Sequence, residues 1–458
     1  MQEDRTETES NVRGAQLICE QVRKWPGESK VKYMLEAIMN RRNVEKALLQ
    51  VERNKGVGGV DGMQTDELRD YLSANYQRIR TEVLTGSYKP SPVKKVEISK
   101  PQGGIRMLGI PTVLDRLIQQ SINVWLSPLY EPDFSEFSYG FRPNRNAHQA
   151  VLQAEAFLNE GKTHVVELDL EKFFDTVNHD KLMGLLMRKV KDVPTLRLIR
   201  EYLRSGIMEG GVVSQRVNGT PQGSPLSPLL SNVLLDELDK ELSIRGLSFV
   251  RYADDCSIYV KSEKSAHRVL ASITRYIEKD LKLKVNREKS KVSHPADSTL
   301  LGFSFYQSEG KWSIRIAKKS IERIREKSKA ITKRNNGNNT GQKILKMLPL
   351  IQGWVNYFSI AKAKSVMQSL DSLVRVRLRM GLWKEWKTCS TRVSNLLKLG
   401  AGKHKSYQWG NSSRGYCRIA HSPVLCTTLN NAYFTGQGYR GFYATYSRLT
   451  RETQIPLF

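Results

Sequence analysis

Two adjacent carboxylates, Asp254 and Asp255, lie inside an apolar run that extends from Phe249 to Val260. The apolar residues on both sides predict two short strands, with the acid pair at the bend between them. Two like charges in such surroundings are costly unless a cation lies beside them. Hard carboxylate oxygens held close together suit Mg²⁺, which completes its shell with substrate phosphates. The alternative is a hairpin whose two acids lie at a solvated tip, where Asp is common.

A second strand-like run, Val165–Asp175, carries Asp169 where the strand would end. If this strand lies beside the hairpin of residues 252–260, three carboxylates fall into one cluster. Two metal ions held in that way can activate a 3′-hydroxyl and stabilise the departing pyrophosphate, which is the two-metal route of phosphoryl transfer. The alternative role for Asp169 is to cap the following helix, although Asp175 and Asp180 fit that role better.

The charge of the chain is strongly one-sided. Its 458 residues are enough for two or three domains, and they carry a net charge of +27 with a pI near 9.8. From Lys311 to the end there are 28 Lys and Arg against 5 Asp and Glu, a net charge of +23. A near-neutral body with a basic C-terminal third indicates an enzyme core with a nucleic-acid-binding extension. A charged surface without a partner would normally mix both signs.

The cysteines do not form a disulfide framework. Five are scattered along the chain, and neither a signal-peptide pattern nor a membrane-length apolar run accompanies them: Cys19, Cys256, Cys389, Cys417 and Cys426. We therefore expect a reduced, cytosolic protein with no membrane partner. Cys417, His421 and Cys426 could ligate zinc, but the paired CxxC spacing and a fourth ligand are missing.

Helical and strand patterns alternate up to about residue 305, which predicts an α+β fold, and the remainder is mainly helical. Val93–Leu108 is typical of a hairpin with its turn at Pro101–Gly104 and basic residues on both arms. We expect helices at 30–53, 65–85, 114–129, 148–158, 181–202 with a break at Pro194, from the loop at 219–228 through Leu242, and at 265–281, 318–334, 342–363 and 365–380. We also expect a strand pair at 300–305 and 312–316. Residues 374–379 also alternate like a strand, and no regular structure is predicted after residue 400.

Several segments resemble a known family. Leu168–Asp175, Pro221–Pro228 and Tyr252–Asp255 occur in the order of the three central motifs of reverse transcriptases. Two further segments, Arg106–Val113 and Tyr139–Pro143, resemble those of bacterial group II intron-encoded reverse transcriptase/maturases, and residues 414–423 are similar to the tail of the maturase region. The likeness extends from about residue 30 to 450. Each motif alone is moderately specific, whereas the ordered set is strong.

The resemblance implies a right-hand polymerase with four parts. Residues 1–50 would be an N-terminal extension, 51–305 the fingers and palm, 306–400 a helical thumb/maturase domain, and 401–458 a basic tail that binds DNA or RNA. The chain ends at Phe458 without the metal-binding nuclease domain of many relatives, as in group IIC-like forms. We therefore expect no cleavage of a second DNA strand.

The resemblance also assigns roles to individual residues. Asp169, Asp254 and Asp255 would bind the metal ions, with help from the Leu170 carbonyl. Lys100 and Arg106 would grip the incoming triphosphate, because phosphates favour such cations; alternatively they are solvated hairpin charges. Phe174 would block a 2′-hydroxyl, unless it is a core aromatic, a role that Phe173 fits better. Gln222 would touch the nucleotide or the template.

The implied activity is RNA-directed DNA polymerisation. The protein would extend a DNA 3′-end on an RNA template with dNTPs and two Mg²⁺ ions, with Mn²⁺ as the alternative metal. It would also bind its intron RNA to assist splicing and mobility, in the bacterial cytosol beside the nucleoid. Two alternatives stay open: a host-adopted enzyme for DNA repair or defence without an intron partner, and an RNA-folding splicing cofactor with a relic active site. The presence of all three acids argues against the second.

Overall fold

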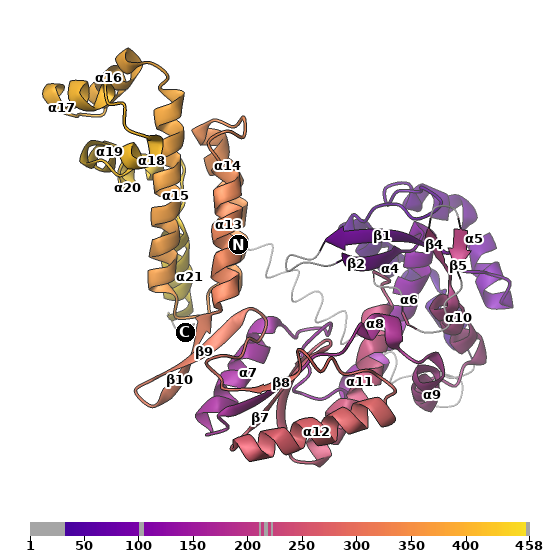
Figure 1. Cartoon of the computed structure of the whole chain (residues 1–458). Coiled ribbons are helices and arrows are strands. Elements are labelled where there is room, and N and C mark those ends of the chain that lie inside the picture. Colours follow the sequence, from indigo (N-terminus) through magenta and orange to yellow (C-terminus); the bar gives the residue numbers. More distant parts are fainter. Residues whose placement is uncertain (1–32, 100–104, 210–211, 215–218, 221–222, 455–458) are drawn as a thin grey trace. The chain divides into compact units, whose positions relative to one another are not determined.

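The computed structural model describes residues 33–99, 105–209, 212–214, 219–220 and 223–454, which form two compact units that divide between Ser293 and His294 (Figure 1). Helices and strands occur together in both units, which confirms the predicted α+β class. Every helix in the described part of the chain is too short or too polar to cross a bilayer.

The first unit is built around a four-stranded sheet in the order β6-β7-β3-β8, with all neighbours antiparallel. Its strands are β3 His164–Leu168, β6 Ser248–Tyr252, β7 Asp255–Val260 and β8 Lys291–Ser293. The two strands predicted around the acid pair are confirmed, as is the strand that ends before Asp169. Except for Asp255 at its first position, β7 is buried along its whole length, so it lies in the core.

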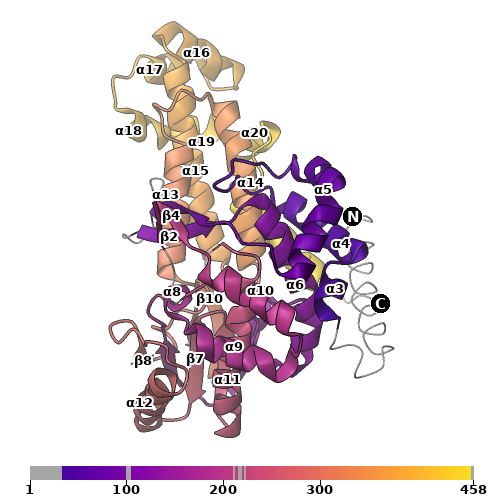
Figure 2. The ribbon, with the colours of Figure 1, turned by 90° about the vertical axis from the view of Figure 1, so that its right-hand side faces the viewer.

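Three helices pack against this sheet: α7 Ala147–Asn159, α11 Ser227–Ile244 and α12 Glu263–Lys279. In both views α12 lies along the part of the sheet that contains β7 and β8 (Figures 1 and 2). Val166, Phe249 and Ile258 from three different strands have no exposed surface. The apolar positions that predicted strands therefore form a dense core beneath the hairpin, and this core fixes the ends of β3 and β7 relative to each other.

A second sheet in the same unit has the order β2-β1-β4-β5. The predicted basic hairpin is confirmed as an antiparallel pair, whose turn lies outside the described residues. The strands are β1 Val93–Ser99, β2 Ile105–Ile110, β4 Ile207–Glu209 and β5 Val212–Ser214. The remaining helical elements of this unit are α3 Met34–Ile38, α4 Arg41–Asn54, α5 Leu68–Thr85, α6 Val113–Tyr130, η1 Glu131–Asp133, α8 Phe173–Thr176, α9 His179–Lys189 and α10 Val193–Arg204.

The prediction of one helix over residues 30–53 is wrong in its described part. The chain leaves the helical conformation at Asn40, which has an extended backbone and accepts a hydrogen bond from the Arg42 amide at 3.0 Å. Asn40 thus caps the start of α4, and its side chain provides the oxygen that a helix N-terminus needs. Asn40, a polar residue between the apolar positions of the helical pattern, was the sequence signal for this boundary.

The second unit begins with the predicted strand pair, β9 Phe303–Ser308 and β10 Lys311–Ile316, and continues as helices. The strand-like alternation at 374–379 is wrong as a strand, because these residues lie inside one long helix in which Leu370, Val374 and Leu378 are buried on one face. The helices are α13 Lys318–Ile331, α14 Thr340–Phe358, α15 Lys364–Glu385, α16 Cys389–Lys398, α17 Lys403–Gly410, α18 Tyr416–Ala420, α19 Pro423–Thr428, α20 Asn431–Gly436 and α21 Phe442–Gln454.

The last helix, α21, packs against α14 and α15 and completes a helical bundle with α13 (Figure 1). Asp371 on α15 accepts hydrogen bonds from the amides of Phe442 and Tyr443, at 2.8 and 2.9 Å, and from the Tyr439 hydroxyl at 2.9 Å. A Cβ at Gly441 would lie 2.5 Å from an oxygen of this carboxylate. The buried carboxylate therefore caps α21 and anchors it to the bundle.

Replacing Asp371 with alanine is expected to destabilise the second unit by about 1–3 kcal/mol, because the first amides of α21 lose their acceptor in a buried place. Denaturant unfolding of the full chain measures this change. Glu326→Ala removes an exposed acid of α13 and is the control. Equal unfolding midpoints for the two variants would show that Asp371 does not anchor the helix.

Candidate active site

The backbone brings the three predicted metal ligands to one edge of the central sheet. Leu168 pairs with Cys256 in the register of β3 and β7, so the next position outward sets Asp169 opposite Asp255. Asp254 lies in the two-residue turn between β6 and β7. The Asp169 backbone is itself fixed, because its carbonyl accepts a hydrogen bond from the Asn286 amide at 2.8 Å.

The carboxylates at this edge of the sheet interact electrostatically. The pKa of Asp255 is raised to about 6, first by reduced hydration among protein atoms and then by the negative charges of Asp254 and Asp169. The Lys289 ammonium acts in the opposite direction, and it lies 3.5 Å from a carboxylate oxygen of Asp169. Asp255 keeps contact with solvent, so loss of hydration is limited there. We therefore take the charges of Asp254 and Asp169 to be the main reason why the pKa of Asp255 is raised. A divalent cation would reverse their effect.

The side chains do not form a chelating set as they stand. Within the described ranges, no three Asp, Glu, His or Cys side chains are arranged to hold one metal ion. Asp169 is instead paired with Lys289. The oxygen donors and their backbone positions nevertheless fit a divalent cation, since hard cations take carboxylate oxygens. Leu170, whose carbonyl is the fourth predicted ligand, forms an isolated bridge with Val285, and its role stays a prediction.

The raised pKa of Asp255 predicts a pH dependence of stability in the absence of metal. Between about 4 and 6 the folded protein holds a proton on Asp255 that the unfolded chain releases, so this group makes the folded state more stable as the pH falls through 6. We expect the melting temperature to rise from pH 7 to pH 5 more in the wild type than in Asp255→Asn. Thermal melts with EDTA measure the difference. Identical pH profiles of the melting temperature for both proteins would show that Asp254 and Asp169 do not raise the pKa of Asp255.

A buried ion pair supports the turn that carries the acids. Arg251, the residue before Tyr252 in β6, is fully buried and donates to both carboxylate oxygens of Asp239 on α11, at 2.7 and 2.6 Å. Its guanidinium also donates to the carbonyl of Ala253 at 3.0 Å. Ala253 has a φ of 58°, a left-handed conformation that a residue with a side chain rarely adopts. Arg251 therefore holds a strained turn in place, a role that the sequence analysis missed.

The predicted nucleotide-binding residues are described only in part. Lys100 and Gln222 lie outside the described residues, and Arg106 is described only by its backbone, which pairs with Ile98 in the basic hairpin. Phe174 on α8 is partly buried, and its ring lies against Phe173 with the centroids 5.2 Å apart. Phe173 is buried in the core, as predicted.

Backbone contacts bring described parts of these predicted segments close to one another. The amide of Thr220 donates to the carbonyl of Phe174 at 2.5 Å. A Cβ at Gly223 would lie 3.1 Å from the carbonyl oxygen of Gly109 in β2. Thr220 thus lies beside α8, and Gly223 lies beside β2, the strand that carries Arg106.

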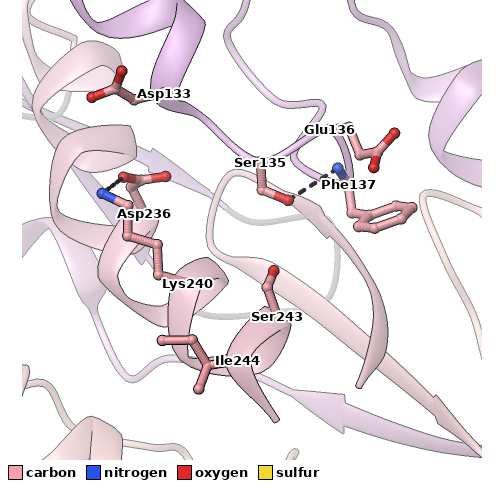
Figure 3. Close-up of a pocket in the computed structure, with 8 residues that line it drawn as sticks. All are labelled: Asp133, Ser135, Glu136, Phe137, Asp236, Lys240, Ser243 and Ile244. Carbon is pink, nitrogen blue, oxygen red and sulfur yellow. Dashed lines mark hydrogen bonds and ion pairs between the residues drawn. The ribbon is translucent and has the colours of Figure 1, made fainter. Parts of the chain in front are cut away.

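A separate pocket lies beside α11 (Figure 3). It has a volume of about 420 Å³ and lies between the C-terminal half of α11 and residues 133–137. Lys240 forms an ion pair with Asp236 on one wall, at 2.6 Å. None of the predicted site residues that the structure describes lines this pocket. We therefore place the chemistry at the open sheet edge and not in this pocket.

Cys417, His421 and Cys426 do not form a zinc site in the described chain. Cys417 is exposed, and the sulfur of Cys426 accepts a hydrogen bond from Arg379 at 3.4 Å. Arg379 also donates to the carbonyl of Leu429. Cys426 therefore helps to fasten α19 to α15.

Comparison with known proteins identifies the family. Residues 98–354 match the model of the family described as "Reverse transcriptase (RNA-dependent DNA polymerase)", and residues 321–400 match "Group II intron, maturase-specific domain". Because the first match covers more than half of the chain, the chain belongs to the reverse transcriptase family. It also carries a group II intron maturase region.

Two curated relatives illustrate the extent of the similarity. Protein YkfC of Escherichia coli (strain K12) is 34% identical over 285 residues, which cover 54% of this chain and 74% of that protein. The group II intron-encoded protein LtrA of Lactococcus lactis subsp. cremoris is 34% identical over 240 residues, which cover 52% of this chain and 39% of that protein. The chain thus spans less than half of LtrA.

These matches confirm the predicted family, the reverse transcriptase fold and the enzyme class of RNA-directed DNA polymerase. They also imply that RNA and DNA are its partners. Proteins of this family normally use divalent metal ions. The bacterial origin, the missing nuclease domain and the individual site residues stay predictions.

Proposed function

We propose that Asp169, Asp254 and Asp255 together hold two divalent ions, Mg²⁺ in the cell, and that the protein uses this site to extend a DNA primer on an RNA template. The observation that carries the proposal is the position of the three acids at one edge of the sheet, where the charges of Asp169 and Asp254 raise the pKa of Asp255. When bound, the ions would stabilise negative charge on the attacking and leaving oxygens.

The chain's own residues position the reactants. Ionised Asp255 is needed for metal binding, so activity should fall as the pH drops below about 6. Arg251 fixes the Ala253 carbonyl and with it the turn. Lys100 and Arg106 would grip the triphosphate of the incoming dNTP.

Phe174 would select deoxynucleotides, and Gln222 would lie beside the nucleotide or template. The support is the backbone contact between Thr220 and Phe174, which joins the described residue two positions before Gln222 to α8.

Replacing Phe174 with alanine is expected to raise the use of ribonucleotides relative to deoxynucleotides about 10- to 100-fold, because the space for a 2′-hydroxyl opens. Extension of a DNA primer on an RNA template, with dNTPs or NTPs and with Mg²⁺ or EDTA, measures this ratio and the metal requirement together. Leu152→Ala on α7 removes an exposed apolar side chain and is the control. An unchanged ratio in Phe174→Ala would remove this residue from the nucleotide site.

A second function, assistance to the splicing and mobility of an intron RNA, is favoured by the match to the maturase-specific domain at residues 321–400. The +23 charge beyond residue 310 supplies the cations for an RNA backbone. The alternative is a host-adopted enzyme for repair or defence. A structured intron around the reading frame, whose splicing the protein accelerates, would support the first. Its absence would favour the alternative.

The four-part division of the chain is also a proposal. The compact units divide at Ser293 and His294, near the proposed end of the palm at residue 305. The anchoring of α21 by Asp371 favours a tail that is fastened to the thumb bundle at its end. The helices between residues 403 and 436 would then be the part of the tail that contacts nucleic acid.

A further inference from the structure

Phe141 combines two unfavourable features that packing does not explain. Its side chain is 54% exposed, and its backbone has a φ of 59°. A bulky residue in the left-handed region is strained, and such residues cluster at ligand-binding and catalytic places. An exposed phenyl ring gains nothing from the core. The fold therefore tolerates both backbone strain and an exposed ring at one position.

The residue before it lies directly on the acid-bearing turn. A Cβ at Gly140 would lie 2.3 Å from the Ala253 nitrogen, so only glycine fits there. The Asn232 side chain donates to the Gly140 carbonyl at 2.9 Å, and the Tyr139 amide donates to the Arg251 carbonyl at 2.8 Å. Phe141 is thus one residue away from a backbone contact with the turn before Asp254.

The residue after it is equally fixed. Arg142 is buried, and its guanidinium pairs with the Glu131 carboxylate at 2.8 Å and donates to the Ser138 carbonyl at 2.7 Å. Because Ser138 pairs in parallel with Arg251, the chain at Gly140–Phe141 leaves the sheet at the same edge as the acid turn. Both neighbours of Phe141 are tied down while its ring stays in solvent.

We propose that the ring of Phe141 stacks on a base of the primer strand near its 3′ end. The proposal rests on the proposed function, in which the primer 3′-hydroxyl must reach the acids beside this turn. Every base offers a π-face, and an aromatic side chain provides a stacking surface that does not depend on sequence. The rigid neighbours fix the ring before the primer arrives, which lowers the entropy cost of binding.

Glycine and tyrosine substitutions separate the ring from the backbone strain. Phe141→Gly removes both, because glycine adopts a positive φ freely. Its unfolding midpoint should equal or exceed that of the wild type, while the Kd for a primer–template duplex should rise about tenfold, within the range measured for base–aromatic stacking. Phe141→Tyr keeps the ring and should bind like the wild type. Met187→Ala on α9, where the side chain is also 54% exposed, is the control.

A fluorescent 2-aminopurine at the primer 3′ end reports the contact without any chemistry. The wild type and Phe141→Tyr should quench it on binding, and Phe141→Gly should not. Unchanged affinity and quenching in Phe141→Gly would overturn the proposal, as would a response only from a probe in the template strand. Failure of the polymerase proposal shows up separately, as a wild type that binds the duplex and does not extend it with dNTPs and Mg²⁺.

Discussion

Replacing Asp254 with asparagine is expected to reduce primer extension by at least about a thousandfold, while the fold stays intact. Asparagine keeps the shape of the side chain and removes the charge that a divalent ion needs. Loss of several kcal/mol of transition-state stabilisation, about 4 kcal/mol, corresponds to this factor. Asp254 is partly buried in a turn whose backbone is held by Arg251, so the substitution should leave the hairpin in place.

Single-turnover extension at saturating dNTP and Mg²⁺ measures this loss, and the thermal melt of the variant confirms folding. Asp180→Asn is the matched control, because it neutralises an exposed carboxylate at the start of α9 whose partner is Arg200 on α10. A rate for Asp254→Asn within tenfold of the wild type would remove this residue from the metal site.

Replacing Arg251 with methionine should have the largest effect on stability, a loss of about 3–5 kcal/mol for the first unit, because Asp239 is left as a buried charge without its partner. Both side chains have no exposed surface. The double variant Arg251→Met with Asp239→Leu should recover most of this loss, since apolar residues of similar volume replace a buried ion pair at little cost. Urea unfolding of the three proteins gives the comparison.

The same pair of variants separates stability from positioning. In the double variant the carbonyl of Ala253 still lacks the Arg251 guanidinium, which donates to it at 3.0 Å in the wild type. We therefore expect recovered stability together with primer extension that remains at least about tenfold below the wild type, a loss of about 1.4 kcal/mol. Full recovery of both quantities would mean that Arg251 only stabilises the fold and does not position the acid turn.

The β6–β7 hairpin and the position of Asp169 beside Asp255 could be predicted from the sequence, because both follow from local patterns. Apolar runs on each side of an acid pair specify two strands, and the first strand ends at the third acid. Arg251 could not be assigned in this way. A lone arginine inside an apolar strand indicates a buried partner, but Asp239 looks like any polar residue of an amphipathic helix until α11 packs on β6.

Between residues 416 and 436, periodicity was not informative because the helices are too short to show a full apolar stripe. α18, α19 and α20 contain five or six residues each. Local signals were nevertheless present, since Ser422 before Pro423, and Asn430, both cap helix starts. The exposure of the Phe141 ring could not be predicted either, because a sequence does not show which aromatic side chains lie outside the core.

Localised cleavage by iron tests the convergence of the three acids most directly. Fe²⁺ substitutes for Mg²⁺, and with ascorbate and peroxide it cuts the backbone next to the bound ion. We predict two groups of cuts, at residues 168–171 and 252–256, that excess Mg²⁺ suppresses and that Asp255→Asn weakens. Cuts confined to one of the two segments, or cuts insensitive to Mg²⁺, would contradict a shared metal site.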